Sequence, residues 1–316
     1  MQVSAPAIIC QLLITGGEGD KLTVGLWIQV ILNGLAMGIL YSLPALGISL
    51  IWNASGLFNF AQGDLLTLGG YFMLSLFGAF KLPYILAFVM TIAIMGLIGY
   101  FLSRIYFYPM LEHRVNPQVI LIGTVALSVF IRNLILVIWG TTPQTFRNPF
   151  GTQVMQIGGV YLMPHVIWIV AIVTVLLSVL QYILRGTMVG TAMRAVAQRQ
   201  TAAWLMGIRN ARMIALTFSL STIVAAVSGM LIAPIIPLTP SMGGMISVKA
   251  MAAVLIGGLG SFGGALLGGV AVGIAEALFA TLVTPTYKDI FIFLVLVLFL
   301  VFRPGGIFRA QVSEKV

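Results

Sequence analysis

Long apolar runs alternate with short polar stretches along almost the whole chain. A helix needs about 20 apolar residues to cross the hydrocarbon core of a bilayer. The runs that meet or approach this length are 27–50, 58–80, 84–103, 119–139, 165–184, 213–236, 265–283 and 290–302. The second run includes the polar, glycine-containing stretch 59–64, so we expect an irregular helix there. The pattern predicts an all-α bundle with about eight or nine membrane spans.

The basic residues predict how these spans are oriented, because Lys and Arg gather in the cytoplasmic loops of membrane proteins. Ten of the sixteen basic residues lie in three clusters, at 104–114, 185–212 and 303–315. Two clusters on the same side of the membrane must be separated by an even number of crossings. Only three clear spans separate the clusters at 185–212 and 303–315. We therefore expect a broken or half helix within 245–263. Nine crossings would leave the amino terminus outside and the carboxyl terminus in the cytoplasm; eight would put the carboxyl terminus outside.

Composition agrees with membrane residence. The chain is 60% hydrophobic and 7% charged, with a mean hydropathy of +1.11, whereas soluble domains carry about 25% charged residues. The net charge of +9 is expected from cytoplasmic Lys and Arg, so we expect no nucleic-acid partner. A single cysteine allows no intrachain disulfide, and two distant histidines provide no metal site with conventional ligand spacing. We expect one membrane domain over 1–316, with its bundle at 27–302.

Glycine spacing favours close helix packing. Residues 258–263 match GxGxxG, but a dinucleotide site needs a preceding strand, and both flanks here are apolar membrane runs. Small residues four apart let helix backbones touch in a membrane. The glycines that we assign to such packing are Gly34, Gly38, Gly264, Gly268, Gly269 and Gly273.

Ionisable residues within the spans are candidates for a transport pathway. A centred charge costs roughly 2.5 to 3.5 kcal/mol on insertion scales, so such residues face the protein interior or water. An interior ion pair or a subunit contact is an equally good interpretation. Arg132 lies toward the outer end of its span, where it can snorkel. The residues that we expect to line or shape the pathway are Asn59, Gln62, Asp64, Lys249 and Glu276.

Two loops have recognisable patterns. The loop 140–164 contains a stretch of alternating polarity followed by Gly158 and Gly159, which is typical of a small hairpin. The loop 190–208 is rich in alanine and has no internal Gly or Pro before Gly207, so it predicts one helix. That helix would lie on the membrane surface or dock a cytoplasmic partner.

Several of these stretches resemble the Liv-type permeases, the membrane subunits of branched-chain amino-acid ABC importers. They are Asn59-Phe60-Ala61-Gln62-Gly63-Asp64, Gly190-Thr191-Ala192-Met193-Arg194-Ala195, Gly207-Ile208, Lys249-Ala250 and Gly257-Gly258-Leu259-Gly260-Ser261. The similarity runs from about Gln29 to the carboxyl end, and it is greatest to the first of the two paired permeases.

The resemblance implies a particular assembly in the bacterial inner membrane. A second homologous permease, two cytoplasmic ATPases and a periplasmic binding protein would be the partners. ATP and Mg would bind to the ATPases, with no cofactor on this chain. The loop 190–208 would be the coupling segment, where Thr191, Arg194 and Ala195 match the family. Gln198 and Arg199 stand where members commonly carry an acidic pair, so no particular salt bridge is carried over.

The favoured function is therefore a non-enzymatic import subunit that works by alternating access. The chain has no GxxxxGK[ST] motif, as expected if ATP binds elsewhere. The alternative is an ion- or proton-coupled secondary transporter that uses Asp64 and Glu276. An intramembrane enzyme has little to build on, because Ser–His, paired-Asp and metal constellations are missing from the spans. The motifs do not select among branched-chain amino acids, urea, amides and aromatic acids, nor between two different permeases and two identical ones.

Overall fold

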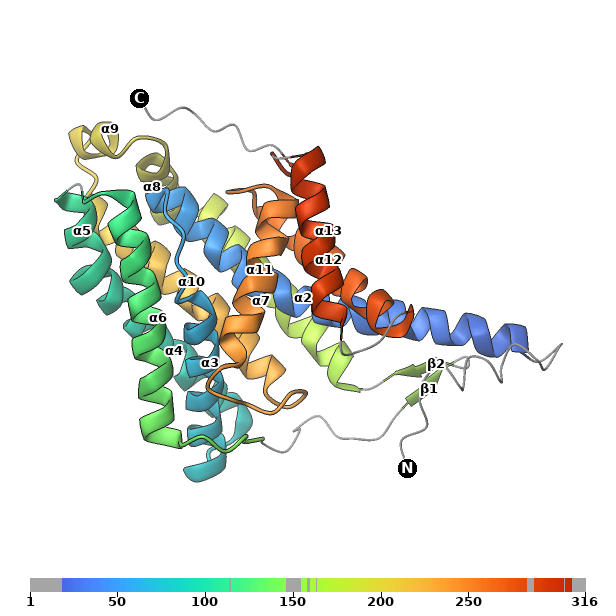
Figure 1. Cartoon of the computed structure of the whole chain (residues 1–316). Helices are drawn as coiled ribbons and strands as arrows, with labels where there is room; N and C mark the ends of the chain where they lie inside the picture. The colour runs from blue at the N-terminus through green and yellow to red at the C-terminus, as the bar shows by residue number, and fades with distance from the viewer. Residues whose placement is uncertain are drawn as a thin grey trace.

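The computed structural model in Figure 1 describes residues 19–113, 115–145, 155–157, 160–162, 164–282, 287–303 and 305–308. The elements, in order, are α2 (Gly19–Ser55), α3 (Gln62–Leu74), the π-helix η1 (Ser75–Ala79), α4 (Tyr84–Leu102), the π-helix η2 (Ser103–Phe107), α5 (Tyr108–Glu112), α6 (Pro117–Trp139), β1 (Met155–Ile157), β2 (Val160–Leu162), α7 (Pro164–Gly186), α8 (Met188–Gln198), α9 (Gln200–Leu205), α10 (Asn210–Ile232), α11 (Met242–Gly257), α12 (Phe262–Leu282) and α13 (Lys288–Phe302).

The predicted fold class is confirmed: the chain is a polytopic bundle of membrane-spanning helices. In the described residues, the helices long and apolar enough to cross a bilayer are Trp27–Ser55, Tyr84–Glu112, Pro117–Trp139, His165–Gly186, Asn210–Ile232 and Phe262–Leu282. Met242–Gly257 and Ile292–Phe302 are shorter apolar helices. At 16 residues, α11 is shorter than the roughly 20 that a full crossing needs, as expected for a half helix.

Helix boundaries follow from local chemistry. α6 begins with Pro117, and the side chain of the preceding Asn116 accepts a hydrogen bond from the Gln118 amide. A proline is tolerated in the first turn because its missing N–H would have no partner inside the helix. The same helix stops at Gly140, whose φ of +82° suits glycine. The hairpin expected in the loop 140–164 is present, with β1 antiparallel to β2.

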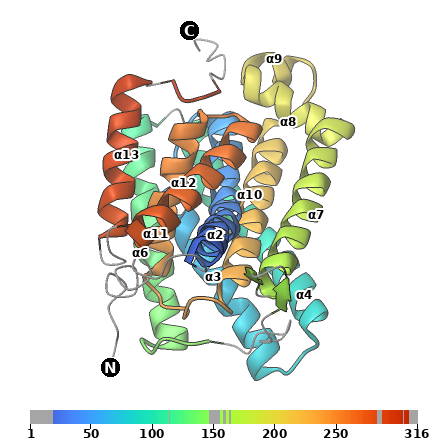
Figure 2. The same cartoon turned by 90° about the vertical axis from the view of Figure 1, so that its right-hand side faces the viewer.

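The later part of the long helix α2 runs through the centre of the bundle and packs against α10, α11 and α12, while its first turns project beyond the other helices (Figures 1 and 2). Its glycines allow close backbone contact with α12. A Cβ added to Gly38 would lie 2.7 Å from Val270 Cα, and one on Gly34 would lie 2.9 Å from Ile274 Cα. Peripheral helices instead expose apolar side chains, such as Val137 on α6, as lipid-facing helices do.

Several segments far apart in the sequence meet at one end of the bundle. The amide of Asn53, near the end of α2, donates to Gly260 O at 2.8 Å. Gln200 in α9 reaches Ala54 O at 3.4 Å. The Ile307 amide donates to Ile256 O at the end of α11. Figures 1 and 2 show α8, α9 and the end of α13 together at this end.

The prediction of one continuous helix over 190–208 is wrong. Arg199 has extended backbone angles, φ −149° and ψ 107°, and separates α8 from α9. Side-chain contacts maintain the break, because Asn210 Nδ2 donates to Gln200 O at 2.8 Å and ties α9 to the start of α10. Helix propensity alone does not include such a tertiary contact.

Candidate functional site

The first turn of α3 begins inside the protein. Residues 57–61 are not helical, and α3 starts at Gln62. Asn59 Oδ1 accepts a hydrogen bond from the Ala61 amide at 3.1 Å. Asn59, Gln62 and Asp64 are all buried. Irregular backbone at membrane depth is tolerated only where protein or a water-filled cavity surrounds it, so this start is an interior feature.

The Gln62 side chain connects three helices. Its Nε2 donates to Ser221 O on α10 at 3.1 Å. The Ser221 hydroxyl lies 3.2 Å from Gln62 Oε1 and 2.9 Å from Gly47 O on α2. Nε2 therefore has a partner and Oε1 shares the Ser221 hydroxyl proton with Gly47 O, which lowers the cost of burying the amide. Ser221 had no distinguishing feature in the sequence.

Asp64 pairs with α6. Its carboxylate accepts a hydrogen bond from the Ser128 hydroxyl, and Arg132 Nε lies 3.4 Å from its Oδ1. Ser128 and Arg132 are four residues apart and so share one side of α6. The Arg132 side chain is 37% exposed, against 2% for Asp64. The idea that Arg132 merely snorkels is corrected, because its guanidinium faces a buried carboxylate.

The starts of α3 and α11 meet beside this pair. A Cβ added to Gly63 would lie 2.6 Å from Ser247 Cβ and would clash with Gly243 O. A Cβ on Gly244 would lie 3.2 Å from Arg132 Nη2. Two helix amino termini, which carry partial positive charge, therefore lie next to Arg132. This arrangement offers donors and positive charge beside one carboxylate.

Lys249 and Glu276 form a second cluster, on α11 and α12. Lys249 Nζ lies 2.8 Å from Glu276 Oε1 and 2.9 Å from Asp289 Oδ1 on α13. The Tyr41 ring covers the ammonium, with its centroid 5.4 Å away. Sequence reasoning missed Asp289, although an acid directly before an apolar run could have indicated it. The structure thus divides the five pathway candidates between two clusters, each held by interior partners.

The coupling candidates lie on α8 and at its end. Gly190, Met193 and Val196 are buried against the bundle, so α8 has one packed side. Thr191 and Arg194 lie on the exposed side, where Arg194 Nη2 donates to Thr191 Oγ1 at 3.2 Å. The remaining candidates are the half-buried Ala195 and the exposed Gln198 and Arg199.

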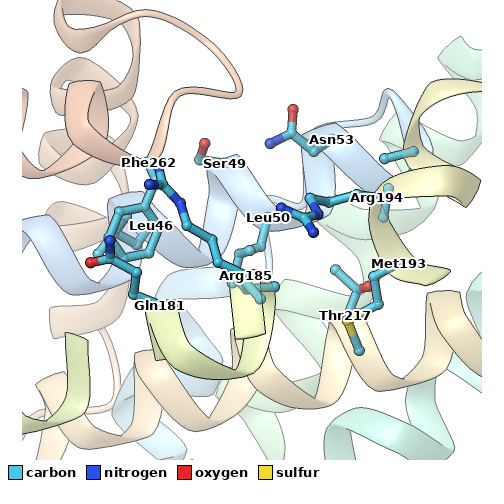
Figure 3. A pocket seen from close by; sticks show the side chains of 13 residues that line it. Leu46, Ser49, Leu50, Asn53, Gln181, Arg185, Met193, Arg194, Thr217 and Phe262 are labelled. Carbon is cyan, nitrogen blue, oxygen red and sulfur yellow. The ribbon is translucent and has the colours of Figure 1, made fainter. Parts of the chain in front are cut away.

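A pocket of about 280 Å³ lies between α8 and the bundle, and Figure 3 shows the side chains around it. Leu46, Leu50 and Met193 contribute apolar surface, while Arg185 from α7 and Arg194 from α8 add positive charge. The pocket thus lies where α8 contacts the membrane bundle, and we call this region the joint under α8.

The packing glycines lie at helix contacts. Besides the α2–α12 contacts of Gly34 and Gly38, a Cβ added to Gly273 would clash with Gly38, and one on Gly269 would lie 2.6 Å from Ser42 Cα. A Cβ on Gly268 would lie 2.9 Å from the carbonyl carbon of Ala253 on α11, and Gly264 faces Gly257. The GxGxxG stretch is a turn between two helices, where Gly258 and Gly260 have positive φ.

Comparison with known proteins identifies the family. LivH of Salmonella typhimurium, a high-affinity branched-chain amino acid transport system permease protein, is 30% identical over 305 residues, covering 92% of this chain and 98% of LivH. LivH of Escherichia coli K12 is 31% identical and BraD of Pseudomonas aeruginosa 30%, with the same coverage. No solved structure matches. Residues 30–300 match the family model for the permease component of the branched-chain amino acid transport system, and the chain belongs to this family.

Proposed function

We propose that this chain is the permease subunit of an ATP-driven importer in a bacterial inner membrane. It moves branched-chain amino acids, or a related small amide or carboxylate, by alternating access. The observation that carries the proposal is the position of α8, which packs onto α2, α7 and α10 and exposes Arg194. Force applied to α8 would reach three membrane helices at once. The names of the relatives support the substrate class.

The energy source lies on other subunits in this proposal. The chain carries no GxxxxGK[ST] motif, so ATP and Mg would bind two cytoplasmic ATPases. A second homologous permease completes the pathway, and a periplasmic binding protein delivers substrate. With the amino terminus outside and the carboxyl terminus inside, α8 faces the ATPases. Their closure would shift the population of the bundle between inward- and outward-open arrangements.

The pathway centres on the paired starts of α3 and α11 in this proposal. A zwitterionic amino acid needs donors for its carboxylate and an acceptor for its ammonium group. The amino termini of α3 and α11, with Arg132, offer the first, and Asp64 offers the second. Asn59 and Gln62 shape the backbone at this point. Lys249 and Glu276 hold α11 against α12 beside the pathway.

The buried carboxylates also favour one alternative, a proton-coupled secondary transporter. Buried acids within spans commonly act in proton relays. In this structure, however, Asp64 faces Arg132, and Glu276 faces Lys249. A proton relay through either carboxylate would therefore have to break an ion pair within the bundle.

Reconstitution distinguishes the two functions. Proteoliposomes would contain this chain, the second permease and both ATPases, with the binding protein and radiolabelled leucine outside. The importer predicts uptake that needs internal ATP and the binding protein and that persists when a protonophore dissipates the proton gradient. Uptake by this chain without ATPases, abolished by the protonophore, would instead establish the secondary transporter. Leucine uptake by neither route would direct the search to the other small amides and carboxylates.

A further inference from the structure

A second pocket, of about 390 Å³, lies between the end of the α4–α5 segment and the start of α10. Three arginines line it, Arg104 from η2 and Arg209 and Arg212 at the start of α10. Two aromatic side chains, Tyr108 and Trp204, complete its walls. The pocket is separate from the joint under α8 and from both buried ion clusters.

Among the described residues, no ion pair balances the charge of this pocket. Arg209 and Arg212 lie in the stretch between Glu112 and Glu276, which contains no Asp or Glu, and Arg104 lies eight residues before Glu112. Within the described part of the chain, none of the pocket arginines forms an ion pair with an acidic side chain. Three guanidinium groups around one cavity repel one another, and an anion from outside would relieve that repulsion.

The helix that starts in the pocket adds further donors. α10 is 23 residues long, and its cap residue Arg209 makes no side-chain hydrogen bond to the first turn. The first amides of a helix have no partner inside it, so those of Asn210 and Ala211 suit an oxyanion. Arginine forks match phosphate oxygens well. The ligand chemistry that fits is therefore a phosphate group.

The depth of the pocket indicates where this phosphate comes from. Arg104 and Tyr108 lie in the last turns of the apolar span Tyr84–Glu112, at the boundary of the hydrocarbon region. Tyr and Trp gather at this boundary in membrane proteins. Phe101 and Ile105, on the same helical segment, expose apolar side chains, with 56% and 74% of their surface accessible. A phosphate bound here would be continuous with a lipid-facing apolar surface.

We propose that this pocket binds the phosphate headgroup of an anionic phospholipid, whose acyl chains lie along the exposed side of α4 and η2. The arginines hold the phosphate, the start of α10 donates to its oxygens, and Tyr108 and Trp204 flank the headgroup. A soluble anion or an acidic partner protein would use the charge but not the adjoining apolar surface. The proposal does not depend on the transport function.

Native mass spectrometry of the full chain tests this site. The protein would be delipidated in detergent and titrated with phosphatidylglycerol, with phosphatidylcholine as the zwitterionic comparison. The variant R104Q/R209Q/R212Q should weaken phosphatidylglycerol binding at least about 100-fold, because each lost charged hydrogen bond to the phosphate contributes about tenfold or more. The matched control R185Q/R199Q/R303Q removes the same charge at the same end of the bundle and should change binding less than about threefold.

Each other outcome overturns the proposal. Equal losses in both variants would show diffuse attraction rather than a site. Unchanged binding in the pocket variant would exclude the headgroup, and loss of ATPase assembly in that same variant would assign the arginines to a protein contact. Displacement of the lipid by millimolar inorganic phosphate would assign the pocket to a soluble anion. Should the triple variant not fold, photoactivatable phosphatidylglycerol on the unaltered chain must label Tyr108 or Trp204, and labelling elsewhere refutes the site.

Discussion

The ion cluster around Lys249 allows a prediction whose size follows from its geometry. Lys249 Nζ faces two carboxylates, at 2.8 Å from Glu276 and 2.9 Å from Asp289. The Glu276 side chain is 7% exposed and that of Asp289 is 28% exposed. Lys249→Met removes the shared cation and leaves Glu276 buried near another carboxylate. Breaking a buried pair in this way costs about 3–5 kcal/mol, and we expect that loss of unfolding free energy.

Substituting the acid, Glu276, should lower the free energy of unfolding less than substituting Lys249. In Glu276→Gln, Lys249 keeps Asp289 as its partner, so the expected loss is about 1–2 kcal/mol, that of a charged hydrogen bond. The double variant Lys249→Met/Glu276→Gln no longer leaves the buried Glu276 carboxylate without its cation, although Asp289 still lacks one. Its loss should therefore fall below the sum of the single losses by about 1–3 kcal/mol, the coupling expected for residues in contact.

Unfolding of the purified full chain by sodium dodecyl sulfate in mixed micelles, followed by tryptophan fluorescence, measures these free energies. Arg303→Met is the control, since it removes a basic charge from an exposed position and should change stability by less than about 0.5 kcal/mol. Equal losses for Lys249→Met and Glu276→Gln would refute the role of Asp289 as the remaining partner. Strictly additive losses would refute the contact itself.

Three further predictions concern coupling, packing and the pathway. Arg194→Glu should abolish stimulation of the ATPases by substrate-loaded binding protein without loss of folded protein, measured as phosphate release, whereas Arg303→Glu should retain it. Gly38→Ala should lower the free energy of unfolding by about 1–3 kcal/mol, because the added methyl group meets α12. Gly263→Ala is its control and should be nearly neutral in the same detergent titration, because a methyl group there meets nothing within 4 Å. Asp64→Asn should lower binding-protein-dependent uptake at least about tenfold, since it removes the charge that we assign to the ammonium site; normal uptake would exclude that role.

Six of the eight predicted runs coincide with helices long and apolar enough to cross a bilayer, because a crossing demands a long apolar run. The irregular start of α3 could also be predicted, because a polar stretch interrupts the run 58–80. The partners of the buried charges could not be predicted from the sequence. Asp64 and Arg132 are 68 residues apart, and nothing in their spacing says that α3 and α6 meet there. The break at Arg199 was also hidden, because it depends on contacts of Gln200 with Asn210 and Ala54.

The distribution of acids along the chain connects the two proposals. Buried cations in the bundle have acidic partners, as Lys249 has in Glu276 and Asp289. At the α8–α9 end, Arg194, Arg209 and Arg212 lie within the long stretch without any Asp or Glu, between Glu112 and Glu276, and Arg104 lies just before it. Cations that are costly to bury are thus paired with acids of the same chain, whereas the arginines at the α8–α9 end are available to anions of other molecules. An ATPase surface facing Arg194 and a lipid phosphate between η2 and α10 would divide these arginines between two anions, so their substitution should affect ATPase stimulation and lipid binding separately.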